Sequence, residues 1–399
     1  MKAGLKGLTV LWASLLLIGY GCGDGSEPES AAGNDYGQAA SPIILPMVFD
    51  SVAAGAFHTC AISGGNLYCW GAGLSGQLGN GANSSTNYRV QESTHASNWA
   101  SVTAGWDYSC AIKTDGSLYC WGYNSEGQLG TGDSVSRNIP TREASSAGDW
   151  ASVSAGGYHT CAKKTNGAIW CWGGNDHDQL GTNDASYRQK SPVQVGTATT
   201  WKSLSNGMWH SCAIKKDGTL WCWGYGWYGQ LGYGSILDKA KPFKVNAATN
   251  WALVASGRQH TCAKKKDGSL WCWGDNVTYG QLGIGKKGGQ KTRPVKVVTA
   301  ITDWNALSLG QYFSCAKRKS GAIYCWGSNG SGQMGLGTEA SPKTKPIKSL
   351  GSGIILTTGG SHTCALKSDQ TLWCWGSNAS GQLGNNSLDT HSSYPVQVN

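Results

Sequence analysis

Residues 207–224 read GMWHSCAIKKDGTLWCWG and place Cys212 and Cys222 ten positions apart. The segment between them contains Lys216-Asp217-Gly218, which suits a three-residue hairpin loop because glycine adopts the left-handed conformation that such a loop needs. With this loop, Cys212 lies directly opposite Cys222 on the neighbouring strand. Opposed residues of paired strands bring their Cβ atoms close to the separation found in disulfides.

The same stretch occurs seven times along the chain. Its cysteine pairs are Cys60-Cys69, Cys110-Cys120, Cys161-Cys171, Cys212-Cys222, Cys262-Cys272, Cys315-Cys325 and Cys364-Cys374. The first members of successive pairs are 50, 51, 51, 50, 53 and 49 residues apart. A period near 50 residues is typical of a solenoid or a propeller.

The first copy indicates whether the paired cysteines face one another. Its cysteines are nine rather than ten residues apart, and its turn is Gly64-Gly65, which is one residue shorter. Cys60 therefore still lies opposite Cys69. This compensation favours a direct cross-strand contact, and we predict one disulfide in each copy.

Zinc is the alternative for these cysteines, because His210 and Cys212 lie on one face of a strand and could converge with Cys222. Structural zinc sites need four ligands, however. The second and sixth copies also carry Tyr108 and Phe313 at the His position and keep both cysteines. The pattern favours disulfides over zinc or buried thiols, and we expect no metal and no cofactor.

Each copy contains four short strands, A to D, which in the fourth copy are WKSLSNG, HSCAI, TLWCWG and PFKV. No helical pattern separates them. We predict an all-β fold, a seven-bladed propeller of four-stranded antiparallel blades with a hairpin disulfide inside each blade. Strand A has small residues beside its glycine, as a crowded axis requires, and strand D starts with proline, which suits an outer edge. Two segments, 42–47 and 395–398, resemble strand D, so the sequence leaves the closure of the ring open.

Two further residue types recur at fixed places in the unit. We interpret the histidines as partly buried rings that form hydrogen bonds within each blade, and the tryptophans of CWG as core between blades. The histidines are His58, His159, His210, His260 and His362, and the tryptophans are Trp70, Trp121, Trp172, Trp223, Trp273, Trp326 and Trp375.

The motifs G-x-x-H-T, W-G-x-N-x-x-G-Q-L-G and the trailing Pro strand resemble the repeats of the regulator of chromosome condensation (RCC1) superfamily over residues 48–398. The resemblance implies the propeller fold, here in a bacterial, exported and disulfide-rich lipoprotein form. The family name also implies guanine-nucleotide exchange on a small GTPase. We keep exchange as a remote alternative, because function depends on sites rather than on the fold.

The N-terminal residues predict export. Lys2 and Lys6 precede the apolar run 8–18, which is too short to span a bilayer comfortably and is typical of a signal peptide. IGYGC then resembles a bacterial lipobox that ends at Cys22, with Gly19 where leucine is usual. We expect a signal peptide at 1–21, a flexible tether at 22–41 after the lipidated Cys22, and the propeller at 42–399. The expected location is the bacterial cell envelope, at the outer membrane, and plain secretion is the alternative.

Composition excludes some classes of protein and leaves others open. With 20 tryptophans and only 14% charged residues, the chain has ample apolar surface to bury and is not disordered. The net charge of +9 favours anionic surfaces in general and does not establish nucleic-acid binding, which we do not expect. No nucleophile–base pair, metal cluster or phosphate loop recurs, so we do not expect an enzyme.

Strand direction separates two faces of the predicted ring. The B–C turns on one face are rich in lysine and form either a solvated rim or a surface for anionic membranes or polysaccharides. The A–B turns on the other face, joined by C–D loops, carry unusually many aromatics. The residues we predict to contact a partner are Phe57, Trp106, Asp107, Tyr158, Met208, Trp209, Arg258, Tyr312, Trp227 and Tyr228.

The aromatic face is typical of a protein-binding surface. Local packing over the channel mouth is the alternative role for these side chains. The leading hypothesis is a binding or scaffold module on the bacterial surface, with an exported or cell-surface protein as partner and membrane contact through the lipid anchor only. The second hypothesis is a propeller that binds glycan or lipopolysaccharide, because aromatic rings also stack on sugars.

Overall fold

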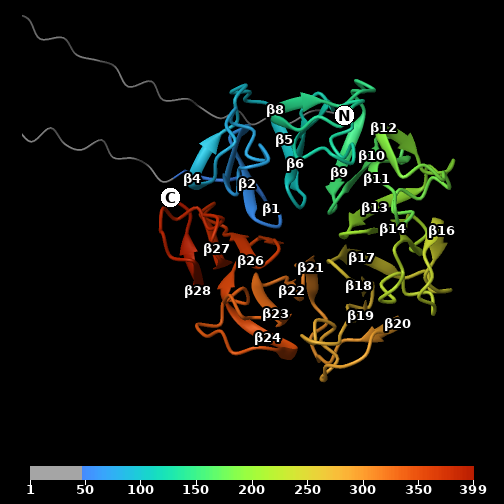
Figure 1. Ribbon diagram of the computed structural model, residues 1–399. Helices are drawn as coiled ribbons and strands as arrows, with labels where there is room; N and C mark the ends of the chain where they lie inside the picture. The colour runs from blue at the N-terminus through green and yellow to red at the C-terminus, as the bar shows by residue number, and fades with distance from the viewer. Residues whose placement is uncertain (1–46) are drawn as a thin grey trace, which may run out of the picture. The chain divides into compact units, whose positions relative to one another are not determined.

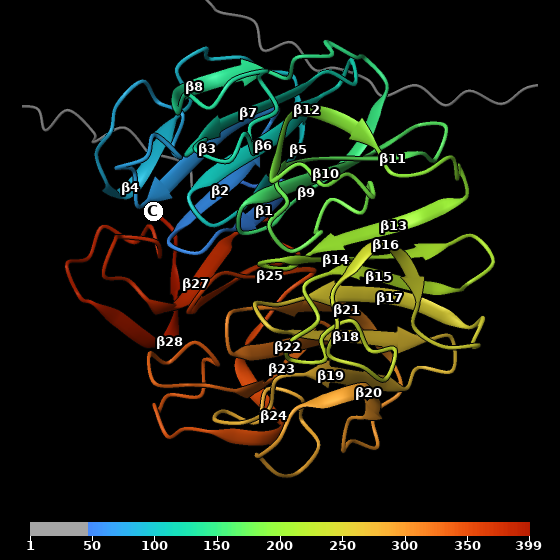
Figure 2. The same ribbon diagram turned by 45° about the vertical axis from the view of Figure 1, so that its right-hand side comes forward.

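The computed structural model describes residues 47–399, which form a closed ring of seven four-stranded antiparallel sheets (Figures 1 and 2). The predicted seven-bladed propeller is therefore confirmed. This part of the chain contains no helix long and apolar enough to cross a bilayer. The predicted signal peptide, the lipidated Cys22 and the tether lie outside the described residues.

Every blade consists of four strands in the order A, B, C, D. The strands are β1 (Ser51–Ala54), β2 (His58–Ser63), β3 (Asn66–Gly71), β4 (Thr86–Gln91), β5 (Trp99–Ala104), β6 (Tyr108–Lys113), β7 (Leu118–Gly122), β8 (Arg137–Arg142), β9 (Trp150–Ala155), β10 (His159–Lys164), β11 (Ile169–Gly174), β12 (Arg188–Gln194), β13 (Trp201–Asn206), β14 (His210–Lys215), β15 (Leu220–Gly224), β16 (Lys239–Lys244), β17 (Trp251–Ser256), β18 (His260–Lys265), β19 (Leu270–Gly274), β20 (Lys291–Lys296), β21 (Trp304–Leu309), β22 (Phe313–Arg318), β23 (Ala322–Gly327), β24 (Lys343–Ser352), β25 (Ile355–Thr358), β26 (His362–Leu366), β27 (Leu372–Ser377) and β28 (His391–Gln397). Within each sheet the strands lie side by side in chain order, so each blade is one continuous segment.

The B–C hairpin has the register that the turn chemistry predicts. Cys212 pairs with Cys222 across β14 and β15, and in the first blade the shorter turn keeps Cys60 opposite Cys69. All seven predicted pairs are disulfides, and the two Cα atoms of each pair lie 4.1 Å apart. The disulfide interpretation is confirmed.

The prediction that strand D begins with proline is wrong. Pro242 is the fourth residue of β16, which starts at Lys239. The register between β15 and β16 shifts between Cys222 and Gly224, so the ladder is interrupted near the proline. Because D is the outermost strand, with no neighbour on its far side, a proline at this irregularity removes little pairing.

The conserved register gives each blade two different faces. On strand B, His58 and Cys60 point towards the next blade, whereas Thr59 and the opposed Trp70 point towards the preceding one. The disulfide of one blade therefore packs against the tryptophan of the next, as Cys60 and Cys69 do in a cluster with Trp121. The seven CWG tryptophans are fully buried, which confirms their interpretation as core between blades.

The histidines were expected to form hydrogen bonds within a blade, and this prediction is wrong. His58 Nε2 lies 2.8 Å from Ser109 Oγ of the next blade, and Ser109 donates its own proton to the Gln77 carbonyl oxygen at 2.9 Å. The serine hydroxyl has one proton, so the histidine must be the donor and carries its proton on Nε2. Trp121 Nε1 donates to the same Gln77 carbonyl.

This His-to-hydroxyl-to-Gln chain recurs at five blade interfaces. The other four chains are His159–Ser211–Gln179, His210–Thr261–Gln230, His260–Ser314–Gln281 and His362–Thr59–Gln382. All five histidine side chains are completely buried rather than partly buried. The chain explains why H and [TS] recur together in the sequence, whereas the glutamine takes part only through its main-chain carbonyl oxygen.

The ring closes through the same non-covalent contacts that join the other blades. Thr59 of the first blade accepts the hydrogen bond of His362 at 2.9 Å, and Trp70 Nε1 donates to the Gln382 carbonyl at 3.0 Å. Residues 395–397 belong to β28 and complete the seventh blade. No strand is exchanged between the first and last blades in the described residues, and residues 42–46 of the other strand-like segment lie outside them.

Removing one disulfide should destabilise the ring without unfolding it. The double variant Cys212→Ala, Cys222→Ala opens a loop of about 11 residues, which corresponds to about 3 kcal/mol on the chain-entropy model. Urea denaturation of the oxidised protein checks this. An unchanged free energy of unfolding would show that the register, and not the bond, supplies the stability of the hairpin.

Acid should destabilise the ring through the buried histidines. Burial lowers the pKa of His210 to about 3, from an ordinary value of 6.5, and the other four behave alike. The unfolded chain therefore binds more protons than the folded chain between these values, and stability is lost as pH falls from 6.5 towards 3. Each histidine contributes on the order of 1 kcal/mol per pH unit in this window.

His210→Phe isolates this effect, because Phe313 occupies the equivalent position in the sixth blade. The free energy of unfolding of the variant should depend less steeply on pH between 6.5 and 3 than that of the wild type. Urea unfolding at a series of pH values measures both slopes. Identical slopes would contradict the assignment of acid sensitivity to the histidines.

Candidate partner-binding face

The A–B turns of all seven blades meet at one mouth of the central channel. The channel cavity has a volume of about 100 Å³ and is lined by the glycines that directly follow the A strands. Glycine is required at this place. A Cβ on Gly55 would lie 2.5 Å from the His58 ring and 2.6 Å from the Gly105 carbonyl oxygen of the next blade. The blades therefore approach closely here and bring their turns together.

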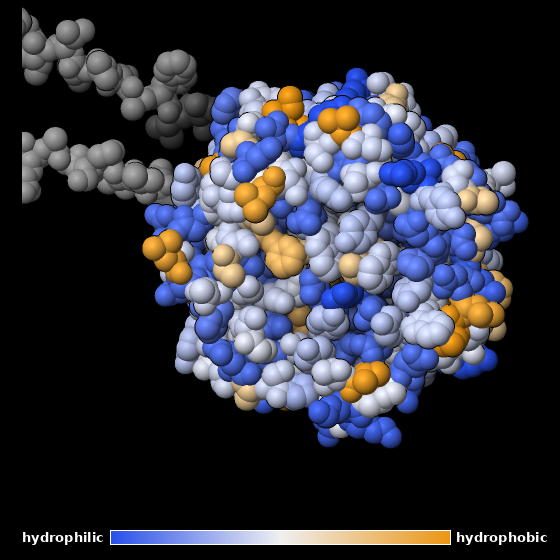
Figure 3. All heavy atoms as spheres, in the orientation of Figure 1, coloured by the Kyte–Doolittle hydropathy of each residue, from blue (hydrophilic) through white to orange (hydrophobic). Residues whose placement is uncertain are grey.

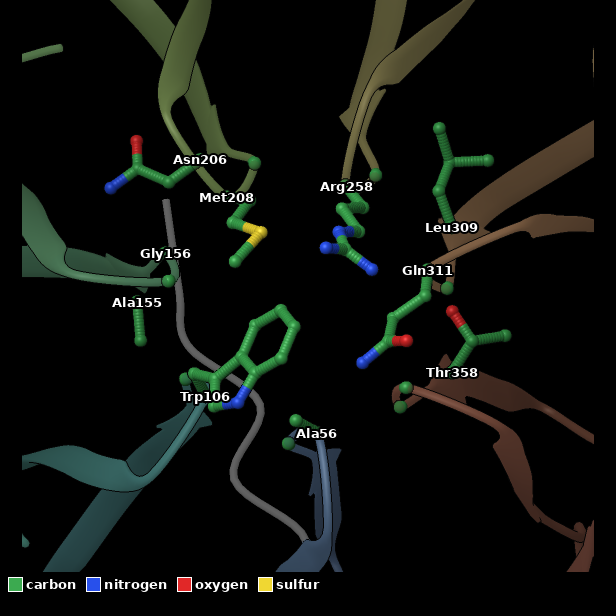
Figure 4. Close-up of a pocket in the computed structure, with 18 of the residues that line it drawn as sticks. Ala56, Trp106, Ala155, Gly156, Asn206, Met208, Arg258, Leu309, Gln311 and Thr358 are labelled. Carbon is green, nitrogen blue, oxygen red and sulfur yellow. The ribbon is translucent and has the colours of Figure 1, made fainter. Parts of the chain in front are cut away.

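The two variable residues of G-x-x-H have different surroundings. Those at the first position line the channel mouth, and they are Ala56, Trp106, Gly157, Met208, Arg258, Gln311 and Gly360. Figure 4 shows the indole of Trp106 lying across the opening, with Met208 and Arg258 directed towards it from other blades. Those at the second position are Phe57, Asp107, Tyr158, Trp209, Gln259, Tyr312 and Ser361.

Trp106 and Arg258 close the mouth together. The Arg258 guanidinium lies 5.6 Å from the centre of the Trp106 ring and 5.1 Å from that of Tyr312, which is cation–π geometry. Arg258 Nη1 also donates a hydrogen bond to the Tyr312 hydroxyl. A charged group held between two rings stays fixed in position, so this part of the face is ordered before any partner arrives.

A row of stacked rings extends outward from this point, and we name it the aromatic ladder. It consists of Phe57, Trp106, Tyr158 and Trp209, contributed by four consecutive blades. Trp106 and Tyr158 stack with centroids 6.5 Å apart and planes 14° apart, and Tyr158 and Trp209 stack at 6.4 Å and 18°. Phe57 meets the edge of Trp106 at 6.1 Å and is 38% exposed.

Side chains from the C–D loops prolong the ladder. Tyr225 lies 5.8 Å from Trp209 and 6.1 Å from Tyr228, centre to centre. His177 lies 4.2 Å from Tyr225, and its Nδ1 is 3.6 Å from an Asp238 carboxylate oxygen. The aromatic surface thus continues without a break across the first four blades.

The sequence matches the RCC1-like domain over residues 18–351 and the RCC1 repeat over residues 355–382 and 369–399. The chain belongs to the RCC1-like domain family. The predicted family and its repeats are thus confirmed. That the chain is a bacterial lipoprotein stays a prediction.

Similar proteins cover parts of this RCC1-like chain. The ultraviolet-B receptor UVR8 of Arabidopsis thaliana is 37% identical over 195 residues, which are 47% of this chain and 44% of the receptor. RUG3, a mitochondrial RCC1 domain-containing protein of the same plant, is 29% identical over 246 residues, which are 58% of this chain and 54% of RUG3. The chain matches less than two thirds of the length of these curated relatives.

Solved structures of low sequence identity share the fold. Prp20p of Saccharomyces cerevisiae superimposes with a TM-score of 0.75 at 20% identity, over 88% of this chain and 87% of Prp20p. Human WBSCR16 gives 0.76 at 19% identity, over 84% and 94% of the two chains. At these identities the likeness shows the fold alone.

The structure distributes the predicted contact residues of this RCC1-like propeller unevenly. Phe57, Trp106, Tyr158 and Trp209 form one surface, with Tyr228 at its end. Trp227 is 59% exposed and stands outside the ladder.

Other predicted contact residues lie beside the aromatic ladder and do not form part of it. Met208 is only 6% exposed, so it fills the channel mouth and presents little surface. Asp107 accepts a hydrogen bond from Gln77 Nε2 at 3.3 Å, and burial raises the pKa of its carboxyl group. Tyr312 pairs with Tyr279 at 5.0 Å, apart from the ladder. In the fifth blade the equivalent turn position holds Gln259, between Trp209 of the fourth blade and Tyr312 of the sixth. The circle of aromatic side chains around the channel is therefore interrupted there.

Sequence reasoning missed His177 and Tyr225. Tyr225 directly follows CWG, as Tyr123 does in the second blade, so its position could have been found by aligning the repeats. His177 had no such signal, because the variant segment NDHDQLG hides its correspondence with the loops of other blades.

The lysines of the opposite face are largely tied to the fold. Lys215 lies 4.8 Å from the ring centre of Trp201 and 4.3 Å from that of Trp221. Lys113, Lys164 and Lys265 lie between equivalent pairs of rings in their own blades. These lysines stabilise the blade edge, which agrees more with the predicted rim than with a surface for anionic membranes or polysaccharides.

Residues 47–399 contain no group of three or more His, Cys, Asp and Glu side chains placed to hold a metal ion.

Hydrophobic residues on the side of the ring drawn in Figure 3 are scattered, and most of that surface is pale or blue. The aromatic ladder is therefore the feature of the A–B turn face that carries a functional interpretation.

Proposed function

We propose that this chain is a protein-binding propeller and that its aromatic ladder holds the partner. The observation that carries the proposal is the unbroken row of ring contacts from Phe57 to Trp209, one edge-to-face and two stacked, at near-constant spacing and with rings from four blades. Packing over the channel mouth requires only Trp106, Met208 and Arg258. Tyr158 and Trp209 extend beyond the mouth, so plugging the channel does not account for them.

The chemistry of the ladder suits a protein interface. Tryptophan and tyrosine bury large areas and lose little side-chain entropy on binding, and they are enriched among residues that dominate binding energy. Stacking already fixes the rings, so a partner does not have to order them. The polar tips of Tyr158, Trp209 and Tyr228 supply hydrogen-bonding groups at the rim of the apolar surface.

The family comparisons favour a protein partner in general terms. The printed description of Prp20p includes its binding to Gsp1p and histones. That description belongs to Prp20p, and it supports only the coarser idea that RCC1-like propellers bind proteins. Exchange activity needs a particular site, and the ladder offers stacking surface rather than such chemistry.

We further propose that the ring works outside the cytosol, in the bacterial cell envelope, on an exported or cell-surface protein. Seven disulfides support this location, because such bonds persist in oxidising compartments and are rare in the cytosol. The predicted signal peptide and lipidated Cys22 agree with it. Contact with the membrane would then occur through the lipid anchor.

The test uses the mature chain as bait for proteins of the source organism's envelope. Wild type, Trp209→Ala and the control Tyr88→Ala are compared by quantitative mass spectrometry. Tyr88 is a matched control because it is 52% exposed on the outer strand β4, away from the ladder. We expect at least one protein to be captured by wild type and control, and at least tenfold less by Trp209→Ala.

Equal capture by all three chains would contradict the proposed surface. The wild type could capture no protein and instead bind purified lipopolysaccharide or polysaccharide, with this binding lost in Trp209→Ala. That result would show that the ladder binds a glycan and not a protein. Thermal unfolding of each variant separates these outcomes from a folding defect.

A further inference from the structure

One blade lacks the aromatic side chain that fills the start of strand A in the others. This residue is a buried tryptophan in five blades, Trp99, Trp150, Trp201, Trp251 and Trp304, and Phe49 in the first. The seventh blade has Gly353 there. The equivalence rests on a shared hydrogen bond. Trp150 N donates to the turn Gly116 of the preceding hairpin, and Gly353 N donates in the same way to Gly321.

A cavity beside Gly353 lies between the sixth and seventh blades on the B–C turn face. Its volume is about 440 Å³. It is lined by the β22–β23 turn on one side, by residues 352–354 below, and by the β26–β27 turn on the other side. The linker between β24 and β25 is only two residues long, so it is too short to cover the cavity.

Lys317 lines this cavity without the partner that its counterparts have. Lys163 and Lys264 occupy the same position two residues after the first cysteine of their blades. Each donates a hydrogen bond to a carbonyl oxygen of the next blade, Lys163 to that of Lys202 at 3.0 Å and Lys264 to that of Trp304 at 2.8 Å. Lys317 is only 5% exposed and has no hydrogen-bond or ion-pair partner among residues 47–399. Burial lowers the pKa of this lysine, as expected for a desolvated ammonium group.

Two further ammonium groups line the same cavity. Lys319 is exposed on one wall, and Lys367 lies on the other, 3.7 Å from the centre of the Trp373 ring. The one acidic residue of the lining is Asp369, whose carboxylate already accepts hydrogen bonds from the backbone N–H and the hydroxyl group of Thr371. The cavity therefore carries an excess of positive charge.

We propose that this cavity binds a phosphate monoester through Lys317, Lys319 and Lys367. Lysine binds phosphate as a point charge, whereas arginine binds phosphate and carboxylate through its planar fork. The arginine of the same turn, Arg318, is already paired with Asp303 at 2.7 Å. The cavity is larger than a bare phosphate ion, so the ester group also enters. The monoester is either a free small molecule or a lipid headgroup, and the site is independent of the aromatic ladder.

The test measures binding of glycerol 3-phosphate by titration calorimetry and of vesicles by co-sedimentation. The vesicles contain phosphatidylcholine with or without one fifth phosphatidic acid, whose headgroup is a phosphate monoester. Lys317→Ile is the main variant, because isoleucine stands at this position in three other blades, as Ile62, Ile112 and Ile214. The matched control is Lys163→Ile, which removes the counterpart lysine where no gap exists.

We expect wild type and Lys163→Ile to bind at least one of the two probes, and Lys317→Ile to bind it at least tenfold more weakly. Binding of glycerol 3-phosphate identifies a free ligand, and binding only of the phosphatidic acid vesicles identifies a headgroup. If Lys317→Ile does not fold, the exposed Lys319→Gln replaces it, with an expected weakening of at least threefold. Binding of neither probe by wild type, or equal binding by wild type and the Lys317 or Lys319 variant, would overturn the proposal.

Discussion

The opposition of two cysteines across the B–C hairpin is the constraint on which the rest of the structure depends. Side chains alternate between the faces of a strand, so fixing Cys212 opposite Cys222 also fixes where His210 and Trp223 point. A slip of one residue would exchange these faces and remove every contact to the neighbouring blades. The disulfide therefore contributes more than chain-entropy stabilisation, because it excludes the alternative register together with the turn and the contacts between blades.

The ring follows from this register through contacts of matching faces. Each histidine donates to a hydroxyl of the next blade, and that hydroxyl donates back to a glutamine carbonyl, so a single chain of hydrogen bonds crosses the interface twice. The last blade repeats the same arrangement with the first, and closure needs no exchanged strand. Because glycines let the A strands approach closely, the A–B turns converge, and rings that are distant in sequence stack into the aromatic ladder.

The sequence predicted what one repeat determines by itself. Strand number, hairpin register and disulfides follow from turn chemistry and spacing inside a single copy, and the number of blades follows from counting the copies. What it did not predict depends on two copies at once. The partners of the histidines lie 51 to 54 residues away in four of the five chains, and the contact of His177 with Tyr225 joins two different blades. The gap at Gly353 is visible in an alignment of repeats as an absent tryptophan, but its lining of lysines becomes apparent only when both neighbouring hairpins are placed.

The most direct test of the central claim is peptide mapping of the unreduced mature protein by mass spectrometry after blocking free thiols. If the hairpin register organises the ring, every linked peptide pair joins the B and C strands of one blade, and Cys212 is found only with Cys222. Free thiols at these positions, or peptides linked between different blades, would show that the strands are not held in this register, and the faces assigned here would no longer follow.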